Sequence, residues 1–231
     1  MKRSKLRSRW LTKDGKKCRA AILENLGSPE KLSEILEGFS AAEDLGDYLD
    51  LRGIDLAGES LAGADLDYAR LNQAVLDECD LSNARFQSAV LDGASLKKVR
   101  GEGVFMIGAS AVGADLEEAD LPGCELTTVD LRQARLRRVR LEGAILSVAK
   151  LAEADVSNAE LQGADLGGAQ GTGARFEQAD LSGASLRNSD LQNASFVGSR
   201  LKDADFAFAR LKDADFTGAE MDNANFAEVQ G

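Results

Sequence analysis

Residues Ala204–Gly218 read ADFAF-ARLKD-ADFTG, three blocks in which a small, a polar and a large apolar residue follow one another. The same phase runs without insertion or deletion from Leu49 to Val229. Stepping by five from Leu51 to Phe226 visits 36 positions, which we call centres, and 24 of them are Leu, 6 Phe and 2 Met. A second series in the same step, from Ile54 to Val229, holds 25 Ala. A fixed period over most of a chain indicates a repeat architecture.

A five-residue period excludes a helix, because each step of five turns the side chain by about 140° and leaves no apolar face. It excludes a flat strand as well, since five is odd and alternate centres would point to opposite faces. The pattern fits a short strand that turns a corner after each centre. The second residue after the centre is often Gly or Asn, which are typical turn formers.

The charges set the number of corners in one coil. Coils of a β-solenoid stack about 4.8 Å apart, so stacked outward residues should avoid like charges. Among residues that precede a centre, a separation of twenty gives thirteen pairs of opposite charge and one of like charge, Glu160/Asp180. Separations of five and fifteen give equal numbers of both kinds. The sequence therefore predicts nine coils of twenty residues with four sides, a rod of roughly 43 Å.

Blocks such as Ala64-Asp65-Leu66 and Ala164-Asp165-Leu166 resemble the A-(D/N)-L-x-x consensus of the pentapeptide repeat proteins. The resemblance implies an all-β solenoid, a right-handed quadrilateral β-helix. It also implies a candidate partner, because the quinolone-resistance and self-immunity members of the family are acidic rods that mimic B-DNA and bind DNA gyrase.

Two regions follow. Residues 1–48 are predicted to form a basic tail and short α-helices that cap the solenoid, and residues 49–231 the β-helix. Thr12 is a candidate N-cap for a helix to about Leu26, and Ser28-Pro29 opens a second helix that ends at Gly38. Ser40 and Glu43 have the spacing of a capping box. A recognition role for these helices, with Trp10 as anchor, is the alternative to capping.

The amino-acid composition limits the cellular environment of the protein and the kinds of chemical site that it can contain. Residues 1–19 contain nine Lys or Arg and one acid, and we expect this tail to be solvated rather than to bind nucleic acid or lipid. The three Cys and the net charge of −11 favour a cytoplasmic protein. Cys79 and Cys124 occupy inward positions on different sides, so a disulfide between them is not expected. We expect both to be buried in place of the Ala that usually occupies this position. No segment has the length of a membrane span, and neither a metal site nor a cofactor site is predicted.

The outward residues differ from side to side. We name the sides A to D after their first centres, Leu51, Leu56, Leu61 and Leu66. The outward residues of side A have no net charge, whereas those of sides B, C and D have net charges of −3, −5 and −4. Residues 49–231 together have a net charge of −13. Side D also presents large apolar residues among acids, a pattern typical of a partner surface, although scattered surface hydrophobes are normal too. The candidate partner-binding residues are Tyr68, Phe105, Ile107, Glu125, Ile145, Val148, Asp165, Asp205 and Phe208.

A basic belt lies midway along the chain and consists of Arg132, Arg135, Arg137, Arg138 and Arg140. For Arg135 and Arg140 the sequence predicts pairing with the acids one coil away, and for Arg137 and Arg138 it predicts solvation. Inward Phe residues gather in the last coils, where no helix follows the repeat. We therefore predict a homodimer joined through Phe216, Met221 and Phe226.

Catalysis is not expected, because the chain has no His and a convex rod offers no cleft to desolvate its carboxylates. The favoured interpretation is a protein-interaction scaffold whose partner is unknown and which does not bind nucleic acid directly. The alternative is a DNA mimic that binds DNA gyrase. Against it, ~43 Å of B-DNA carries about 25 negative charges, while the repeat carries −13.

Overall fold

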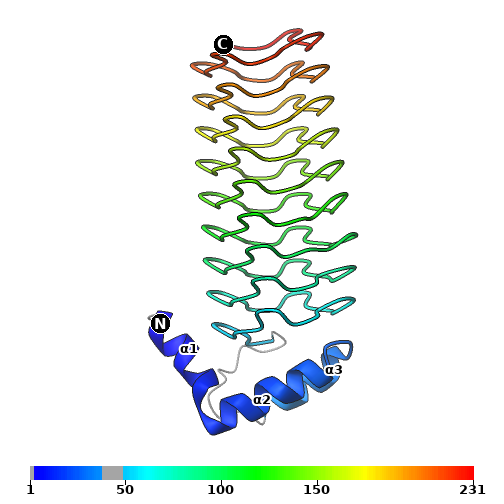
Figure 1. The fold of residues 1–231 in the computed structure, drawn as a ribbon, viewed down its shortest axis with the longest axis vertical. Helices are drawn as coiled ribbons and strands as arrows, with labels where there is room; N and C mark the ends of the chain where they lie inside the picture. The colour runs from blue at the N-terminus through cyan, green and yellow to red at the C-terminus, as the bar shows by residue number, and fades with distance from the viewer. Residues whose placement is uncertain (1–2, 38–48) are drawn as a thin grey trace.

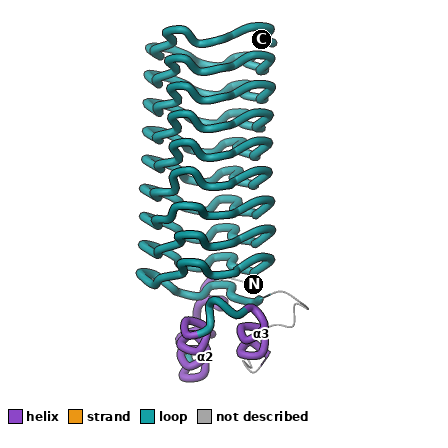
Figure 2. The backbone as a smooth tube through the Cα atoms, turned by 90° about the vertical axis from the view of Figure 1, so that its right-hand side faces the viewer, coloured by secondary structure: helices purple, strands orange, loops and turns teal. Residues whose placement is uncertain are grey.

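The computed structural model describes residues 3–37 and 49–231, which form three helices at one end of a stack of coils (Figure 1). The helices are α1 (Arg3–Leu11), α2 (Lys13–Glu24) and α3 (Pro29–Glu37). The view turned by 90° shows the coils stacked in register along one axis (Figure 2). None of the described helices is long and apolar enough to cross a bilayer.

Each coil contains twenty residues. Parallel β-bridges join residues twenty positions apart, from Asp50–Arg70 at the first coil to Arg210–Gln230 at the last. The bridges are isolated because the chain turns after each centre. The second residue after a centre donates to the next coil as well, as the N–H of Gly63 does to the carbonyl of Ser82 at 2.8 Å. The twenty-residue period predicted from the charges is confirmed.

A hydrogen-bonded turn follows most centres. The N–H of Ala64, for example, donates to the carbonyl of Leu61 at 3.0 Å. The second residue after the centre has a positive φ at all 36 positions, of which only 15 are Gly. Positive φ is free for Gly but strained for bulky and β-branched residues. Val148, at φ 60°, is therefore held in a conformation that it disfavours.

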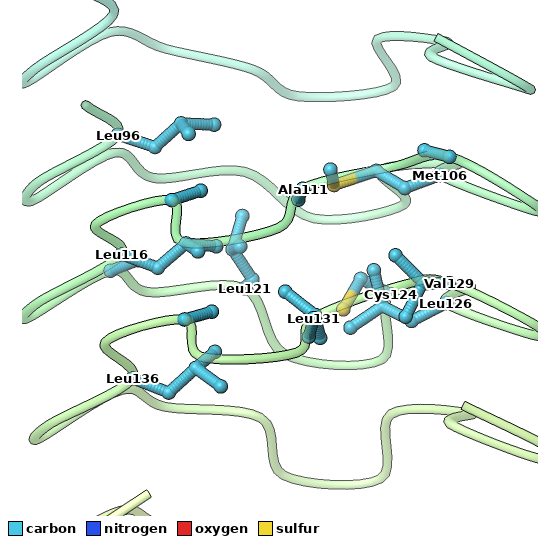
Figure 3. Packing of buried hydrophobic residues seen from close by; sticks show 14 of the residues in the cluster. Leu96, Met106, Ala111, Leu116, Leu121, Cys124, Leu126, Val129, Leu131 and Leu136 are labelled. Atoms are coloured by element: carbon cyan, nitrogen blue, oxygen red, sulfur yellow. The ribbon is translucent and has the colours of Figure 1, made fainter. Parts of the chain in front are cut away.

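The core is a column of centres and small residues along the axis. Leu96, Leu116 and Leu136 are almost wholly buried and lie over one another from coil to coil (Figure 3). Towards the last coils the column becomes aromatic, with Phe176, Phe196 and Phe216 stacked at centroid distances of 5.0 Å. Phe206 stacks on Phe226 in the same way. Burial of these side chains is the main stabilising term for the solenoid.

The predicted helices of the cap are present. Thr12 caps α2 and accepts a hydrogen bond from the N–H of Gly15 at 2.9 Å. The helix ends at Glu24, two residues before the predicted Leu26, because Asn25 leaves the helical conformation. The segment from Ser28 forms α3, whose Leu32 and Leu36 are buried. The predicted capping box at 40–43 lies outside the described residues.

The basic tail is not simply solvated, contrary to the prediction. Residues 3–11 form α1, and Leu6, Arg9 and Trp10 are buried. The Arg9 guanidinium donates to both carboxylate oxygens of Asp50, at 2.5 and 2.8 Å. Trp10 Nε1 donates to the carbonyl of Arg52 at 2.9 Å. Trp10 is thus an internal contact of the first coil and not an exposed anchor for another protein.

All three thiols are free and buried. Burial raises the pKa of Cys18 and Cys79 to about 11 and that of Cys124 to about 12. Cys79 Sγ also donates to the carbonyl of Leu56 at 3.0 Å. Cys79 and Cys124 therefore act as the predicted substitutes for Ala and hold little thiolate at neutral pH.

The raised thiol pKa values predict a pH effect on stability. The folded state keeps these protons to a higher pH than the unfolded state, so the free energy of unfolding should fall from about pH 9 upwards. Urea unfolding between pH 7 and pH 11 measures this. The double variant Cys79→Ala/Cys124→Ala should fall less steeply over that range, and an equally steep fall would contradict the assignment.

Candidate interaction face

Exposed apolar side chains concentrate on side D. Nine large apolar residues are exposed in the described chain, and six of them are on this side. Tyr68 and Val148 are the most exposed of the six, at 48% and 47%. The predicted exposure of these side chains is confirmed; their binding role is a prediction still. The six are Tyr68, Phe105, Ile107, Ile145, Val148 and Phe208.

The central four of these residues occupy two coils separated by one. Phe105 bridges to Glu125, and Glu125 bridges to Ile145, so Phe105 and Ile145 are two rungs apart on one ladder. Ile107 and Val148 belong to the turns of the same two coils. Tyr68 lies two coils before this patch and Phe208 three coils after it. The six residues therefore form a broken line parallel to the rod axis, with the central four as its largest part.

Acidic side chains of side D are held in fixed positions. Asp165 accepts hydrogen bonds from Ser147 Oγ at 2.6 Å and from the N–H of Gly167 at 2.8 Å. Glu125 accepts from the hydroxyl and the N–H of Thr127. Among the described residues, neither Glu125 nor Asp165 forms an ion pair. These two carboxylates leave the middle of side D negative.

Two Arg residues of side D are already engaged. Arg85 pairs with Asp67 at 2.6 Å, and Arg187 pairs with Asp205 at 2.8 Å. The hydrogen bond from Arg187 holds the pKa of Asp205 below its usual range. The Arg187 guanidinium also lies 5.5 Å from the ring centroid of Phe208. Asp205 and Phe208 are thus tied to one cation at the far end of the line.

The predicted dimer residues lie in the last two coils, away from the central patch. Phe216 and Phe226 are partly buried against the core, and Met221 is 42% exposed. The N–H of Leu211 donates to the carbonyl nineteen residues ahead, Gln230, at 2.7 Å.

Ion pairs also form at spacings that the sequence comparison did not consider. At least seven of the thirteen predicted pairs are within 4.0 Å, including Asp115–Arg135 and Asp120–Arg140. Asp67–Arg85 and Asp205–Arg187 are instead eighteen residues apart and join a turn to the next rung. A search of the sequence at a separation of eighteen would have found them.

The basic belt follows the prediction in part. Arg140 pairs with Asp120 and Glu160, as expected. Arg137 and Arg138 are exposed, as predicted, but they form ion pairs that the sequence did not predict, since Arg138 contacts Glu117 and Glu118 at 2.7 Å. Arg137 lies 3.9 Å from Asp155. Turn residues of neighbouring coils stack as closely as the rungs do, so they pair as well.

The belt predicts a salt-dependent effect on stability. Arg140→Glu would place acids at 120, 140, 160 and 180 on successive coils, and like charges directly opposite repel one another. The urea midpoint should fall further than for Arg140→Ala, and 1 M salt should reduce the difference because it screens exposed charges. Equal midpoints for the two variants at low salt would contradict the predicted role of the ladder.

The bridges, turns and buried centres define a β-solenoid protein whose outward residues form surfaces. Comparison with protein-family models identifies the family of β-solenoid proteins to which the chain belongs. The model described as "Pentapeptide repeats" matches residues 49–83, 79–117, 112–147 and 149–188, and the "Pentapeptide repeat region" model matches residues 169–230. The chain belongs to the pentapeptide repeat family.

Solved structures of the family are similar to the chain. HetL, a pentapeptide repeat protein involved in heterocyst differentiation regulation from the cyanobacterium Nostoc, is 30% identical over 77% of this chain and 86% of its own, with a TM-score of 0.45. QnrB1, a plasmid-mediated fluoroquinolone resistance protein, is 18% identical in one trypsin-treated form, over 72% and 88%, with a TM-score of 0.52. Curated protein sequences give no significant match.

Proposed function

We propose that this protein is a non-enzymatic scaffold that binds a protein partner through side D. The observation that carries the proposal is the concentration of exposed apolar side chains on that one side. Apolar residues surrounded by acids are typical of the core and rim of a protein interface. The buried thiols with raised pKa values and the absence of His support a binding role over a catalytic one. We also infer the right-handed quadrilateral form, since four turns follow one another within each twenty-residue coil.

Loss of partner capture tests the scaffold. The triple variant Phe105→Ser/Ile145→Ser/Phe208→Ser removes apolar surface from side D without touching the core. In a pulldown from host lysate, partners held by the parent protein should be lost with this variant. The control Leu11→Ser/Val229→Ser changes exposed apolar residues elsewhere and should retain them. Recovery of the same partners by the triple variant would exclude side D as the site.

A type II topoisomerase such as DNA gyrase is the second candidate partner. It is favoured by the net charge of −13 carried by residues 49–231 along a rod of roughly 43 Å, which has the sign and length of a DNA segment. Gyrase supercoiling assays with increasing protein, with and without a quinolone, test this candidate. Supercoiling that stays unchanged in both series would remove it.

We propose in addition that the last coil pairs with a second copy of the chain. The partly buried Phe216 and Phe226 and the exposed Met221 support this, because apolar surface of this kind marks interaction sites. Light scattering at micromolar concentration should give the mass of a dimer. Met221→Lys should shift it to the monomer, and a monomeric parent protein would contradict the proposal.

A further inference from the structure

We propose that the partner segment bound by side D is an amphipathic α-helix with a heptad apolar stripe and basic flanks, lying along the rod axis. The inference rests on the proposed function and specifies the chemistry of its partner. It is carried by the spacing of the apolar rungs and by the two carboxylates among them that form no ion pair within the described chain.

The spacing of the apolar rungs matches a helix. Phe105 and Ile145 are two rungs apart on one ladder, or roughly 9.6 Å at the usual strand separation. Tyr68 lies two coils before Phe105, and Phe208 lies three coils after Ile145. A heptad of α-helix rises about 10.5 Å, close to the two-coil intervals from Tyr68 to Phe105 and from Phe105 to Ile145. The three coils to Phe208 are longer than one heptad, so the helix register rests on the first two intervals. Same-face residues of an extended strand recur about every 6.8 Å and fall out of step at once.

The charge of the face selects the flanks of that helix. Glu125 and Asp165 are partly exposed, two coils apart, and neither forms an ion pair within the described chain. Lys or Arg residues one heptad apart on a partner helix would meet both of them. The Asp165 coil also carries Gly167 and Gly168 in its turn, so the partner backbone can approach closely beside Val148. Nucleic acid, which is negative, does not fit this face.

Three of the exposed apolar residues occupy turns. Tyr68, Val148 and Phe208 have φ values of 60°, 60° and 63°, a conformation that they share with eighteen other non-Gly turn residues. What sets these three apart is that they are the large apolar residues among the turn positions and that all three are exposed. They add apolar contact area to side D beside the rungs.

Synthetic peptides test the inference directly. The probe is a labelled 28-residue peptide of four heptads, with Leu at positions a and d and with Lys at e and g, which repel one another in a self-dimer. One comparison peptide has the same composition without a stripe, a second has Glu in place of Lys, and a third alternates Leu and Lys as a strand would. Fluorescence anisotropy measures the affinity of each, and circular dichroism measures helix formation on binding.

The heptad peptide with Lys should become helical and bind at least about tenfold more tightly than each comparison peptide, as expected for a few anchors that dominate binding. The triple variant Phe105→Ser/Ile145→Ser/Phe208→Ser should weaken it by about the same factor, while Leu11→Ser/Val229→Ser should leave it unchanged. Val148→Gly should raise the urea midpoint and weaken peptide binding together. A purely structural role for Val148 would move only the midpoint.

Several results would overturn the inference. Equal binding of the peptide without a stripe, or tighter binding of the alternating peptide, excludes a helix. A dimer of this chain that the triple variant dissociates would make a second copy the occupant. If the triple variant loses partners in the lysate but no peptide binds, the scaffold function is supported and the helical partner is excluded. If neither measurement responds to the triple variant, both proposals are excluded.

Discussion

Leu136→Asp should abolish cooperative folding of the solenoid, and Leu136→Ala should lower the free energy of unfolding by about 2–5 kcal/mol. Leu136 is 1% exposed and stacks on Leu116, the centre one coil before it (Figure 3). A carboxylate at this place has no cation in reach and must be buried alone or protonated, either of which is strongly unfavourable.

The architecture enlarges this effect. Each coil of a repeat protein contacts only its neighbours, so a defect in the middle separates two shorter stacks. Urea unfolding followed by circular dichroism should show two transitions or no folded baseline for Leu136→Asp. Arg135→Ala, which changes the outward residue beside it, is the matched control and should shift the midpoint little. A single transition near that of the parent protein for Leu136→Asp would contradict the inward placement of the centres.

Asp50→Ala should release α1 from the first coil. The side chains of Arg9 and Asp50 are only 6% and 2% exposed, and Arg52 also donates to Asp50 at 2.8 Å. Removing one partner of a buried pair leaves a buried charge without compensation and costs about 3–5 kcal/mol. The first coil would then lose the cover of α1, and the protein should be cut faster by trypsin among residues 3–19.

The double variant Arg9→Met/Asp50→Ala is the informative control. Replacing a buried ion pair with apolar residues of similar volume is often neutral. The double variant should therefore regain much of the protease resistance that Asp50→Ala loses. Trypsin rates for Asp50→Ala equal to those of the parent protein would show that the ion pair does not hold the cap.

Side D was accessible to sequence reasoning because the repeat never shifts phase. Once twenty residues make a coil, every outward position has a known side and rung, and the exposure of Phe105 and Val148 follows directly. Pairs between a turn and the next rung, such as Arg187–Asp205, did not follow, because they depend on which way a long side chain leans. The same reason explains Arg138, whose partners belong to the turn of the previous coil.

The N-terminal helices were predicted less completely than the solenoid. The N-cap at Thr12 and the start of α3 are local signals and were read from the sequence. The helix at Arg3–Leu11 was not, because its basic composition is typical of a solvated tail and its contact with Asp50 spans 41 residues. Only the folded first coil supplies the carboxylate and the carbonyl groups that bind Arg9 and Trp10.

The sequence by itself determined the twenty-residue coil, the inward centres and the side on which each outward residue lies, because a strict period leaves no freedom in register. Tertiary structure decided the docking of α1 and the ion pairs between turns and rungs. These depend on distances between residues far apart in the chain, and such distances exist only after the coils have stacked.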